Sequence, residues 1–334
     1  MDSLFIFLEN EVLHKPIWMW LVFTGLVFGL LALDLGVFNR KDHEIGIKES
    51  LILSAFYITI ALIFGGWIYW ELGERSALEY YTGFVVEKTL AMDNIFVIAL
   101  IFSYLGIPRL YQHRVLFWGI LGVVVLRGLM IGFGTVLVEE FEWILYLFGA
   151  FLIFTGVKML FSSEEETDVS QNFVLKFLHK HFRVTEELHG NKFLIRQPVS
   201  EGSKPVLFLT PLLVALAMIE IADVVFAVDS IPAIFAITTD TYVVYTSNIF
   251  AILGLRALYF TLAAMLARFI YLKYALSLVL VFIGAKIFLK DFHDIIEITP
   301  SMSLSVTLGV LAGGIILSLW KTKSEVEPED DKKD

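Results

Sequence analysis

The chain of 334 residues contains no cysteine, and only 18% of its residues are charged. The first absence excludes disulfides, zinc–thiolate sites, iron–sulfur clusters and thiol redox chemistry carried by the chain itself. The second sets the chain apart from soluble domains, in which about 25% of residues are charged. Phosphate-binding loops, dinucleotide-binding glycine motifs and serine-hydrolase motifs are also missing, so we expect neither an enzyme nor a tightly bound cofactor.

Hydrophobic residues are abundant instead. They make up 57% of the chain, and the aromatic residues include 30 Phe, 7 Trp and 12 Tyr. A lipid bilayer can accommodate such a composition, whereas a soluble core of this length cannot. The formal net charge of −10 argues against a nucleic-acid partner, because nucleic-acid binding needs a basic surface.

Apolar runs of about 20 residues, long enough to cross about 30 Å of hydrocarbon, recur along the chain. We count nine, near residues 17–36, 50–71, 80–104, 113–138, 141–161, 206–236, 242–267, 271–290 and 301–320. Acidic rather than basic residues precede the first run, so we expect a retained span and not a cleaved signal. The sequence predicts an all-α polytopic membrane protein.

Basic residues in the short loops predict the orientation of the spans. Arg40 and Lys41 follow the first span, Arg109 follows the third, Arg268 follows the seventh and Lys321 follows the ninth. These positions fall on one side, so we expect the N-terminus outside and the C-terminus inside.

The chain divides into six predicted segments. They are an N-terminal two-helix segment (1–79), a three-helix repeat (80–161), an insert (162–205), a second three-helix repeat (206–290), a ninth span (291–320) and a disordered charged tail (321–334). The insert should be cytoplasmic, where it could hold a soluble partner. Residues 193–195 and 206–209 carry a weak hairpin signal.

The two repeats share a sequence template. Glu87-Lys-Thr-Leu-Ala-Met-Asp93-Asn94-Ile matches Asp223-Val-Val-Phe-Ala-Val-Asp229-Ser230-Ile. Downstream, Ile-Leu-Gly and Leu-Arg elements recur around Arg127 and Arg256, and a Phe-x-Gly-x-Lys element recurs at Lys158 and Lys286. Each copy has three spans, an odd number, so the copies (spans three to five and six to eight) should cross in opposite directions. Inverted repeats of this kind are typical of secondary transporters.

Five carboxylates fall inside hydrocarbon-length runs: Glu87, Asp93, Glu220, Asp223 and Asp229. Each charged centre costs about 2.5 to 3.5 kcal/mol on insertion scales, so each needs compensation. One interpretation is purely structural, with ion pairs that only orient the helices. The residues able to compensate the charge are Arg127, Arg256, Lys158 and Lys286.

The other interpretation is a cation site. Carboxylates with the amide oxygen of Asn94 and the hydroxyl of Ser230 form a hard, all-oxygen donor set, which suits Mn, Mg or Ca. Six residues turn a regular helix by about 600°, which leaves the paired acids of each motif about 120° apart. We therefore expect a broken helix, with Pro232 helping to unwind the sixth span.

The stretches Glu87 to Val97 and Phe226 to Ala233 resemble the signature motifs of the TerC/Alx family of bacterial integral membrane proteins. The similarity extends from about residue 17 to 320 and includes the Leu-Arg elements and the size of the insert. The family is named for tellurite-resistance operons, is implicated in manganese efflux and in metalation of exported enzymes, and is considered similar to LysE-type transporters. The resemblance implies a multi-pass protein of the bacterial inner membrane. It also implicates seven residues in the ion pathway: Glu87, Asp93, Asn94, Glu220, Asp223, Asp229 and Ser230.

The leading hypothesis is a secondary transporter that exports a divalent metal ion, with Mn²⁺ as the expected substrate and proton counterflow as a subordinate expectation. The alternative is a membrane scaffold of a tellurite-resistance or envelope-stress complex that does not transport. A direct tellurite reductase ranks last, because the chain has neither thiols nor a cofactor motif.

Overall fold

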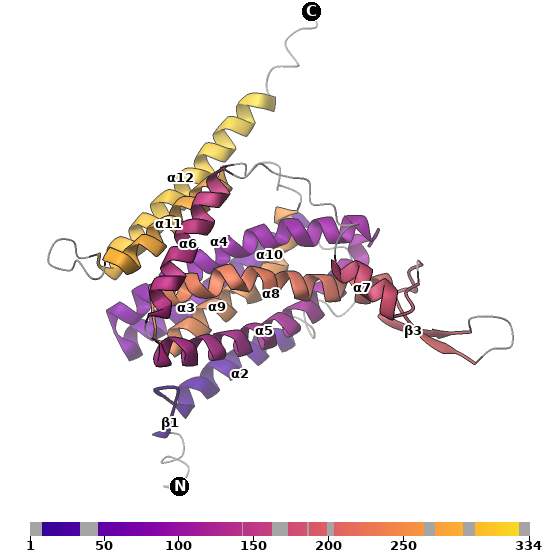
Figure 1. Ribbon diagram of the computed structural model, residues 1–334, viewed down its shortest axis with the longest axis horizontal. Coiled ribbons are helices and arrows are strands. Elements are labelled where there is room, and N and C mark those ends of the chain that lie inside the picture. Colours follow the sequence, from indigo (N-terminus) through magenta and orange to yellow (C-terminus); the bar gives the residue numbers. More distant parts are fainter. Residues whose placement is uncertain are drawn as a thin grey trace, which may run out of the picture.

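A computed structural model describes residues 9–33, 46–141, 143–161, 173–185, 187–198, 204–263, 271–289 and 298–326, without the side chains of Asp93, Phe96, His179, Asp229, Arg256 and residues 322–326. The described chain is mostly helical (Figure 1). The helices are α2 (Ile17–Leu33), α3 (Ile47–Leu72), α4 (Glu74–Tyr104), α5 (Arg109–Glu140), α6 (Ile144–Phe161), α7 (Phe173–His181), α8 (Pro211–Ile237), α9 (Thr241–Leu253), α10 (Leu255–Leu262), α11 (Leu272–Leu289) and α12 (Pro300–Val326). Two short hairpins complete it: β1 (Glu11–Val12) with β2 (Lys15–Pro16), and β3 (Leu194–Gln197) with β4 (Val206–Leu209).

Local sequence explains several helix ends. Gly73, at φ 89°, is the single residue between α3 and α4, and this left-handed conformation favours glycine. Pro108 precedes α5, and Pro211 is the first residue of α8. Backbone N–H groups in the first turn of a helix have no acceptor within the helix, so a proline at this position loses no hydrogen bond. The Asp240 side chain accepts hydrogen bonds from the backbone amides of the first turn of α9.

Six of the described helices have both the length and the apolar composition to cross a bilayer. They are α3, α5, α6, α8, α11 and α12. Helix α4 is long enough, but charged residues including Glu87 and Lys88 interrupt its apolar stretch. Helices α2 and α9 are apolar and shorter. The chain is therefore an all-α membrane protein, and nine spans stay a prediction.

The seventh predicted span is divided. Helix α9 ends at Leu253 and α10 begins at Leu255, with Gly254 between them. The predicted interruption at Pro232 is wrong, because α8 continues through this residue from Pro211 to Ile237. Proline removes a single ladder bond, and the packing of α8 between α4, α5 and α6 supports the helix across that loss.

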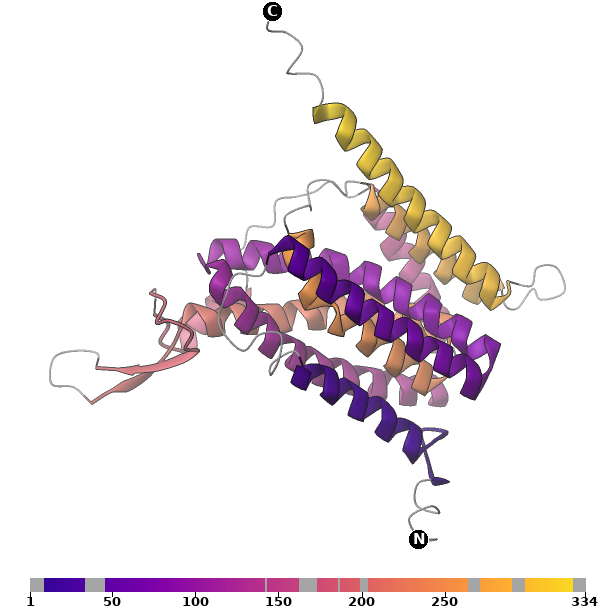
Figure 2. The same cartoon turned by 180° about the vertical axis from the view of Figure 1, so that it is seen from behind.

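The predicted disordered tail starts too early. Helix α12 continues through Val326, so residues 321–326 are helical, while 327–334 lie outside the described residues. The Lys321 ammonium donates to the Tyr271 hydroxyl at 2.6 Å, which ties this end of α12 to the start of α11. The predicted hairpin is confirmed, with β3 pairing antiparallel to β4 from Leu194–Leu209 to Gln197–Val206. It extends away from the helices, next to α7 (Figure 2).

Helix directions follow from which residues meet. Along α4, Asn94 contacts Asp223 and Gly83 contacts Ile234, so α4 and α8 run antiparallel. Helix α5 runs parallel to α8, because its contacts with that helix advance together along both chains. Helix α4 runs parallel to α9 for the same reason. An aromatic cluster fills the space between α2, α3, α4 and α9, with the Phe64 and Phe250 ring centroids 4.7 Å apart.

Helices α6 and α11 make the closest backbone approach. A Cβ on Gly284 would lie 2.6 Å from the Gly149 carbonyl oxygen, and a Cβ on Gly156 would lie 2.7 Å from the Ser277 carbonyl oxygen. These contacts advance in opposite directions along the two helices, so α6 and α11 are antiparallel. Small residues at such crossings allow helix backbones to pack closely in a membrane.

Gly284→Ala should therefore destabilise the protein. The added methyl group has no space between α6 and α11, and such overpacking costs roughly 1–3 kcal/mol. Gly309→Ala on α12 is the matched control, because nothing lies within 4 Å of its Cβ position. The control should gain up to about 1 kcal/mol from helix propensity. Thermal unfolding in detergent measures both variants, and equal midpoints would contradict the close approach.

Candidate functional site

A buried guanidinium joins α4, α5 and α8. Arg127 on α5 is 1% exposed, and its Nη1 donates to the Glu87 carboxylate of α4. Its Nε and Nη2 donate to the two carboxylate oxygens of Asp223 on α8, at 3.1 and 3.0 Å. Nη1 also lies 3.0 Å from the Ser230 hydroxyl and 3.3 Å from the Asn248 amide oxygen. One cation thus binds acids from two helices that are far apart in sequence.

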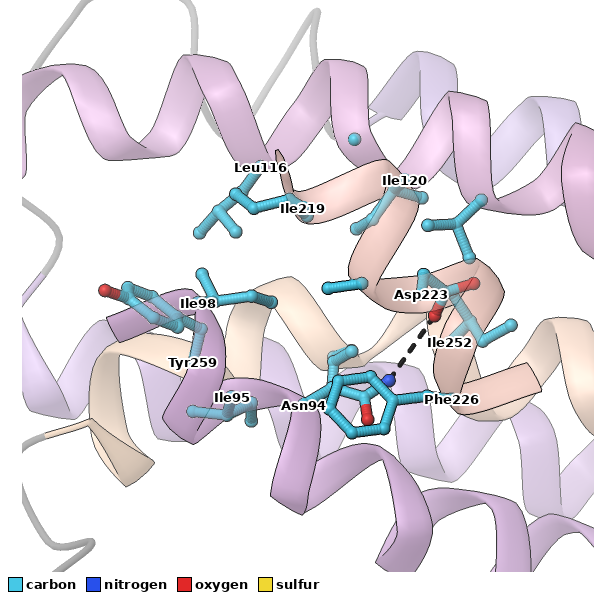
Figure 3. Close-up of a pocket in the computed structure, with 14 residues that line it drawn as sticks. Asn94, Ile95, Ile98, Leu116, Ile120, Ile219, Asp223, Phe226, Ile252 and Tyr259 are labelled. Carbon is cyan, nitrogen blue, oxygen red and sulfur yellow. Dashed lines mark hydrogen bonds between the residues drawn. The ribbon is translucent and has the colours of Figure 1, made fainter. Parts of the chain in front are cut away.

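Amides hold the same two carboxylates from other directions. The Asn248 amide of α9 donates to Glu87 at 3.0 Å, and the Asn94 amide of α4 donates to Asp223 at 3.4 Å. The second of these bonds is visible in Figure 3. The Ser230 hydroxyl is a further hydrogen-bond partner of Glu87. We refer to Glu87, Asn94, Arg127, Asp223, Ser230 and Asn248 as the polar cluster.

Regular helices bring these residues together. Glu87 and Asn94 are seven positions apart on α4, and Asp223 and Ser230 are seven apart on α8. Seven residues complete nearly two turns, so each pair lies on one helix face without any break. The six-residue spacing that suggested a broken helix therefore does not describe the pairs that meet in the cluster.

The cluster is short of positive charge. Two carboxylates share one guanidinium, which leaves a formal charge of −1 among these described side chains. Taking ions out of water costs several kcal/mol each, and the donors around Glu87 and Asp223 offset part of that cost. In an apolar surrounding this imbalance favours binding of a further cation.

Glu220 stands apart from the polar cluster. Its carboxylate packs against Gly122 of α5, where a Cβ would overlap it. Its Oε2 atom is buried and has no hydrogen-bond partner among the described residues. Asp223 lies one helical turn further along α8 and interacts with Glu220 electrostatically. Glu220 therefore carries a buried oxygen whose hydrogen-bonding capacity is unused by the described residues.

Two cavities flank the cluster. One of about 40 Å³ is lined by Asn94 and Asp223 together with apolar side chains of α4, α5, α8 and α10, including Ile98, Leu116 and Tyr259 (Figure 3). The other, of about 310 Å³, is lined by Asn94, Arg127 and Ser230 together with side chains of α6 and α11. Asn94 contributes to the walls of both cavities.

The remaining predicted site residues lie elsewhere or outside the description. The exposed Lys158 lines the 310 Å³ cavity, whereas Lys286 lines a cavity of about 420 Å³ with Arg75 and Glu79. The side chains of Asp93, Asp229 and Arg256 lie outside the described residues, although their backbones belong to α4, α8 and α10. Among the described residues, no group of three or more His, Cys, Asp or Glu side chains could hold a metal.

Sequence reasoning missed two participants, Asn248 and Lys88. Asn248 ends the polar run Thr246-Ser-Asn within an otherwise apolar span, and this run was the available signal. Lys88 is buried beside Glu87, and its ammonium donates to the Ala251 carbonyl at 3.0 Å. The repeat template does not reveal it, because the matching position of the second repeat is Val224.

Arg127→Met should unfold the protein more easily, because it leaves two buried carboxylates without their cation. Breaking a buried pair in this way costs about 3–5 kcal/mol. Arg183→Met is the matched control, since Arg183 is exposed and surface substitutions usually change stability by no more than about 0.5 kcal/mol. Thermal unfolding compares them, and adding Glu87→Gln and Asp223→Asn should recover part of the loss. Equal stability of the two Arg variants would refute the role given to Arg127.

Comparisons with known proteins agree with this description. The family model described as "Integral membrane protein TerC family" matches residues 72–326. A membrane protein of Rickettsia bellii, described as uncharacterized, is 49% identical over 300 residues, covering 90% of this chain and 96% of its own. One of Myxococcus xanthus with the same description is 46% identical over 305 residues, covering 91% and 93%.

A third relative carries a functional name. The "Putative membrane-bound redox modulator Alx" of Escherichia coli is 42% identical over 311 residues, covering 90% of this chain and 94% of its own. No solved structure matches the chain. Because the family model matches well over half of the residues, the chain belongs to the TerC family of integral membrane proteins.

Proposed function

We propose that the chain is a secondary transporter that exports a divalent metal ion, with Mn²⁺ as the favoured substrate. The observation that carries the proposal is the polar cluster, in which Arg127 occupies the space between Glu87 and Asp223. A buried cation held by acids of two helices marks a position where positive charge is stable inside hydrocarbon. A metal ion could exchange with this guanidinium for the same oxygens.

The donor chemistry favours a hard divalent ion. The ligand atoms that the polar cluster offers are carboxylate, amide and hydroxyl oxygens, and its described residues include no sulfur or imidazole ligand. Such oxygens suit Mn²⁺, Mg²⁺ and Ca²⁺ better than softer metals. The unpartnered Glu220 oxygen adds an open ligand one turn from Asp223. In the proposed pathway, Asp93 and Asp229 supply further carboxylates.

We further propose that α4–α6 and α8–α11 form an inverted repeat. Reciprocal contacts support this arrangement: Asn94 binds Asp223, and its template counterpart Ser230 binds Glu87, the counterpart of Asp223. The counterpart helices α4 and α8 are antiparallel, as expected for copies that cross in opposite directions. Substrate sites in such transporters lie at the repeat interface near the membrane midplane.

The third helices repeat this reciprocity. Gly156 and Gly284 are counterparts in the template, and so are Gly149 and Ser277. Gly149 packs against Gly284, while Gly156 packs against Ser277. Each contact becomes the other when the repeats are exchanged, which is the signature of two-fold symmetry. With the remaining helices, the proposal comprises nine spans in a bacterial inner membrane, the N-terminus outside and the C-terminus inside.

The name of the Escherichia coli relative suggests a link to redox state. A chain without cysteine has no thiol with which to carry electrons or exchange disulfides. Under the proposal, any redox effect would follow from the supply of a metal to other proteins. No redox step is assigned to this chain.

Glu220→Gln tests the transport proposal. The substitution removes charge from an oxygen that has no hydrogen-bond partner among the described residues, so the fold should survive. Manganese flux into proteoliposomes should fall at least tenfold, because the ion loses a carboxylate ligand. Glu139→Gln is the matched control, since Glu139 is about half exposed at a helix end. Asp93→Asn should also abolish flux. Wild-type flux in the Glu220 variant would remove Glu220 from the pathway, and absence of flux in the wild type would refute transport.

The projecting hairpin favours the second candidate function, a membrane scaffold. Leu194 and Leu207 on β3 and β4 are 45% and 50% exposed, and the hairpin stands away from the helices (Figure 2). Exposed apolar side chains at such a position suit contact with a soluble partner. Leu194→Ser with Leu207→Ser should then abolish tellurite resistance in cells while manganese flux stays at the wild-type level. If the double variant keeps both tellurite resistance and manganese flux, the result counts against the scaffold function.

A further inference from the structure

Lys88 is a buried lysine outside the polar cluster. It follows Glu87 on α4 and is 8% exposed. Its ammonium donates to the carbonyl oxygen of Ala251 on α9 at 3.0 Å, and no carboxylate lies within ion-pair distance among the described side chains. A buried amino group whose one partner among the described residues is a carbonyl oxygen is costly to keep, so it needs a structural or functional reason.

The carbonyl that binds Lys88 belongs to the end of a broken helix. Ala251 lies in the last turn of α9, and the helix stops at Leu253. The Gly254 amide donates to the Ile252 carbonyl, so the regular ladder is interrupted before α10 begins. Carbonyls at a helix C-terminus carry partial negative charge and favour a nearby cation. The amino group of Lys88 therefore supplies a hydrogen-bond donor to a carbonyl near the point where the helical ladder is interrupted.

Gly254 provides the space for this contact. A Cβ at this position would lie 2.8 Å from the Lys88 ammonium and 3.2 Å from the Cβ of Tyr57. The backbone of Gly254 has φ −81°, which any residue can adopt, so the glycine is explained by space and not by conformation. The absence of a side chain at the break thus leaves the space that the Lys88 amino group occupies.

The matching position of the first repeat behaves differently. Gly122 corresponds to Gly254 in the template, and a charged side chain, that of Glu220, also packs against it. Helix α5 nevertheless continues unbroken from Arg109 to Glu140. A donor such as Lys88 can bind carbonyls that a break releases, whereas an acceptor such as the Glu220 carboxylate cannot. This difference explains why only the second repeat is interrupted here.

The same segment of α9 reaches the polar cluster. Asn248, three residues before Ala251, donates to Glu87 and accepts from Arg127. The consecutive residues Glu87 and Lys88 therefore hold the last turns of α9 at two points. Movement of this helix end would change the ligands of Glu87 directly.

We propose that Lys88 is a positioning residue for ion passage: by binding the Ala251 carbonyl it holds the α9–α10 break at Gly254 and so places Asn248 against Glu87. The inference rests on the proposed transport function. Lys88 does not bind the ion; it acts through the position of α9.

Lys88→Met tests the proposal, because methionine keeps the length of the side chain and removes the donor. Amide hydrogen exchange at residues 252–256 should become at least tenfold faster in the purified full-length protein. Manganese flux into proteoliposomes should lose at least tenfold in maximal rate, with less than a threefold change in the half-saturating concentration. Lys176→Met on the exposed face of α7 is the matched control and should change neither value.

The two readouts separate the possible failures. Exchange and flux at wild-type values in Lys88→Met would overturn the proposal. If the wild type carries no manganese, the transport function fails, while the exchange measurement still decides whether Lys88 holds the break. If Lys88→Met does not fold, Gly254→Ala replaces it, because its methyl group displaces the ammonium. Unchanged exchange in that variant overturns the proposal, and exchange at least tenfold faster at residues 252–256 supports it.

Discussion

The rest of the structure depends on the Arg127 guanidinium, which two carboxylates share inside a bundle of apolar helices. Arg127 can bind Glu87 and Asp223 together only if α4, α5 and α8 meet at one level, and the hydrogen bonds of Asn248 extend this requirement to α9. In a membrane, helices gain little from burying apolar surface against each other. A buried polar network then has more influence on helix arrangement than it has in a soluble protein, because each unpaired member would carry a large desolvation cost.

Two kinds of contact hold the helices together around this network, one made by polar side chains and the other by small residues. The polar cluster joins α4, α5, α8 and α9, while glycines join α6 and α11 through backbone contact. Glycine contacts need close approach and tolerate no added methyl group. Polar contacts tolerate exchange of partners, because a cation can replace another cation between the same oxygens. Under the proposed transport function, the closely packed α6 and α11 would keep the bundle in shape while an ion exchanges at the polar cluster.

Much of the architecture was predictable, because hydrophobic length and the repeated motifs report directly on helices in a bilayer. The hairpin at β3 and β4 was also predictable. The sequence predicted a break at Pro232, but α8 continues through this residue and the break lies between α9 and α10. Whether a helix breaks depends on which donors face the freed carbonyls. The donor at the observed break is Lys88, which belongs to another helix. Likewise, the six-residue spacing of the motif acids drew attention away from the seven-residue spacing of Glu87 and Asn94, which places both on one face. Asn248 lies outside the template and only tertiary contact reveals its role.

The shortness of the connections at one end of the bundle has a consequence for recognition. Gly73 alone joins α3 to α4, residues 141–143 join α5 to α6, and residues 238–240 join α8 to α9. The cavity lined by Arg75, Asp240 and Lys286 lies at this end. Chain this short offers a protease or an antibody almost no extended backbone to grip, whereas α7 and the β3–β4 hairpin belong to the opposite end. A macromolecule that approaches these three connections therefore meets helix ends, whereas the β3–β4 hairpin offers it a strand edge to contact.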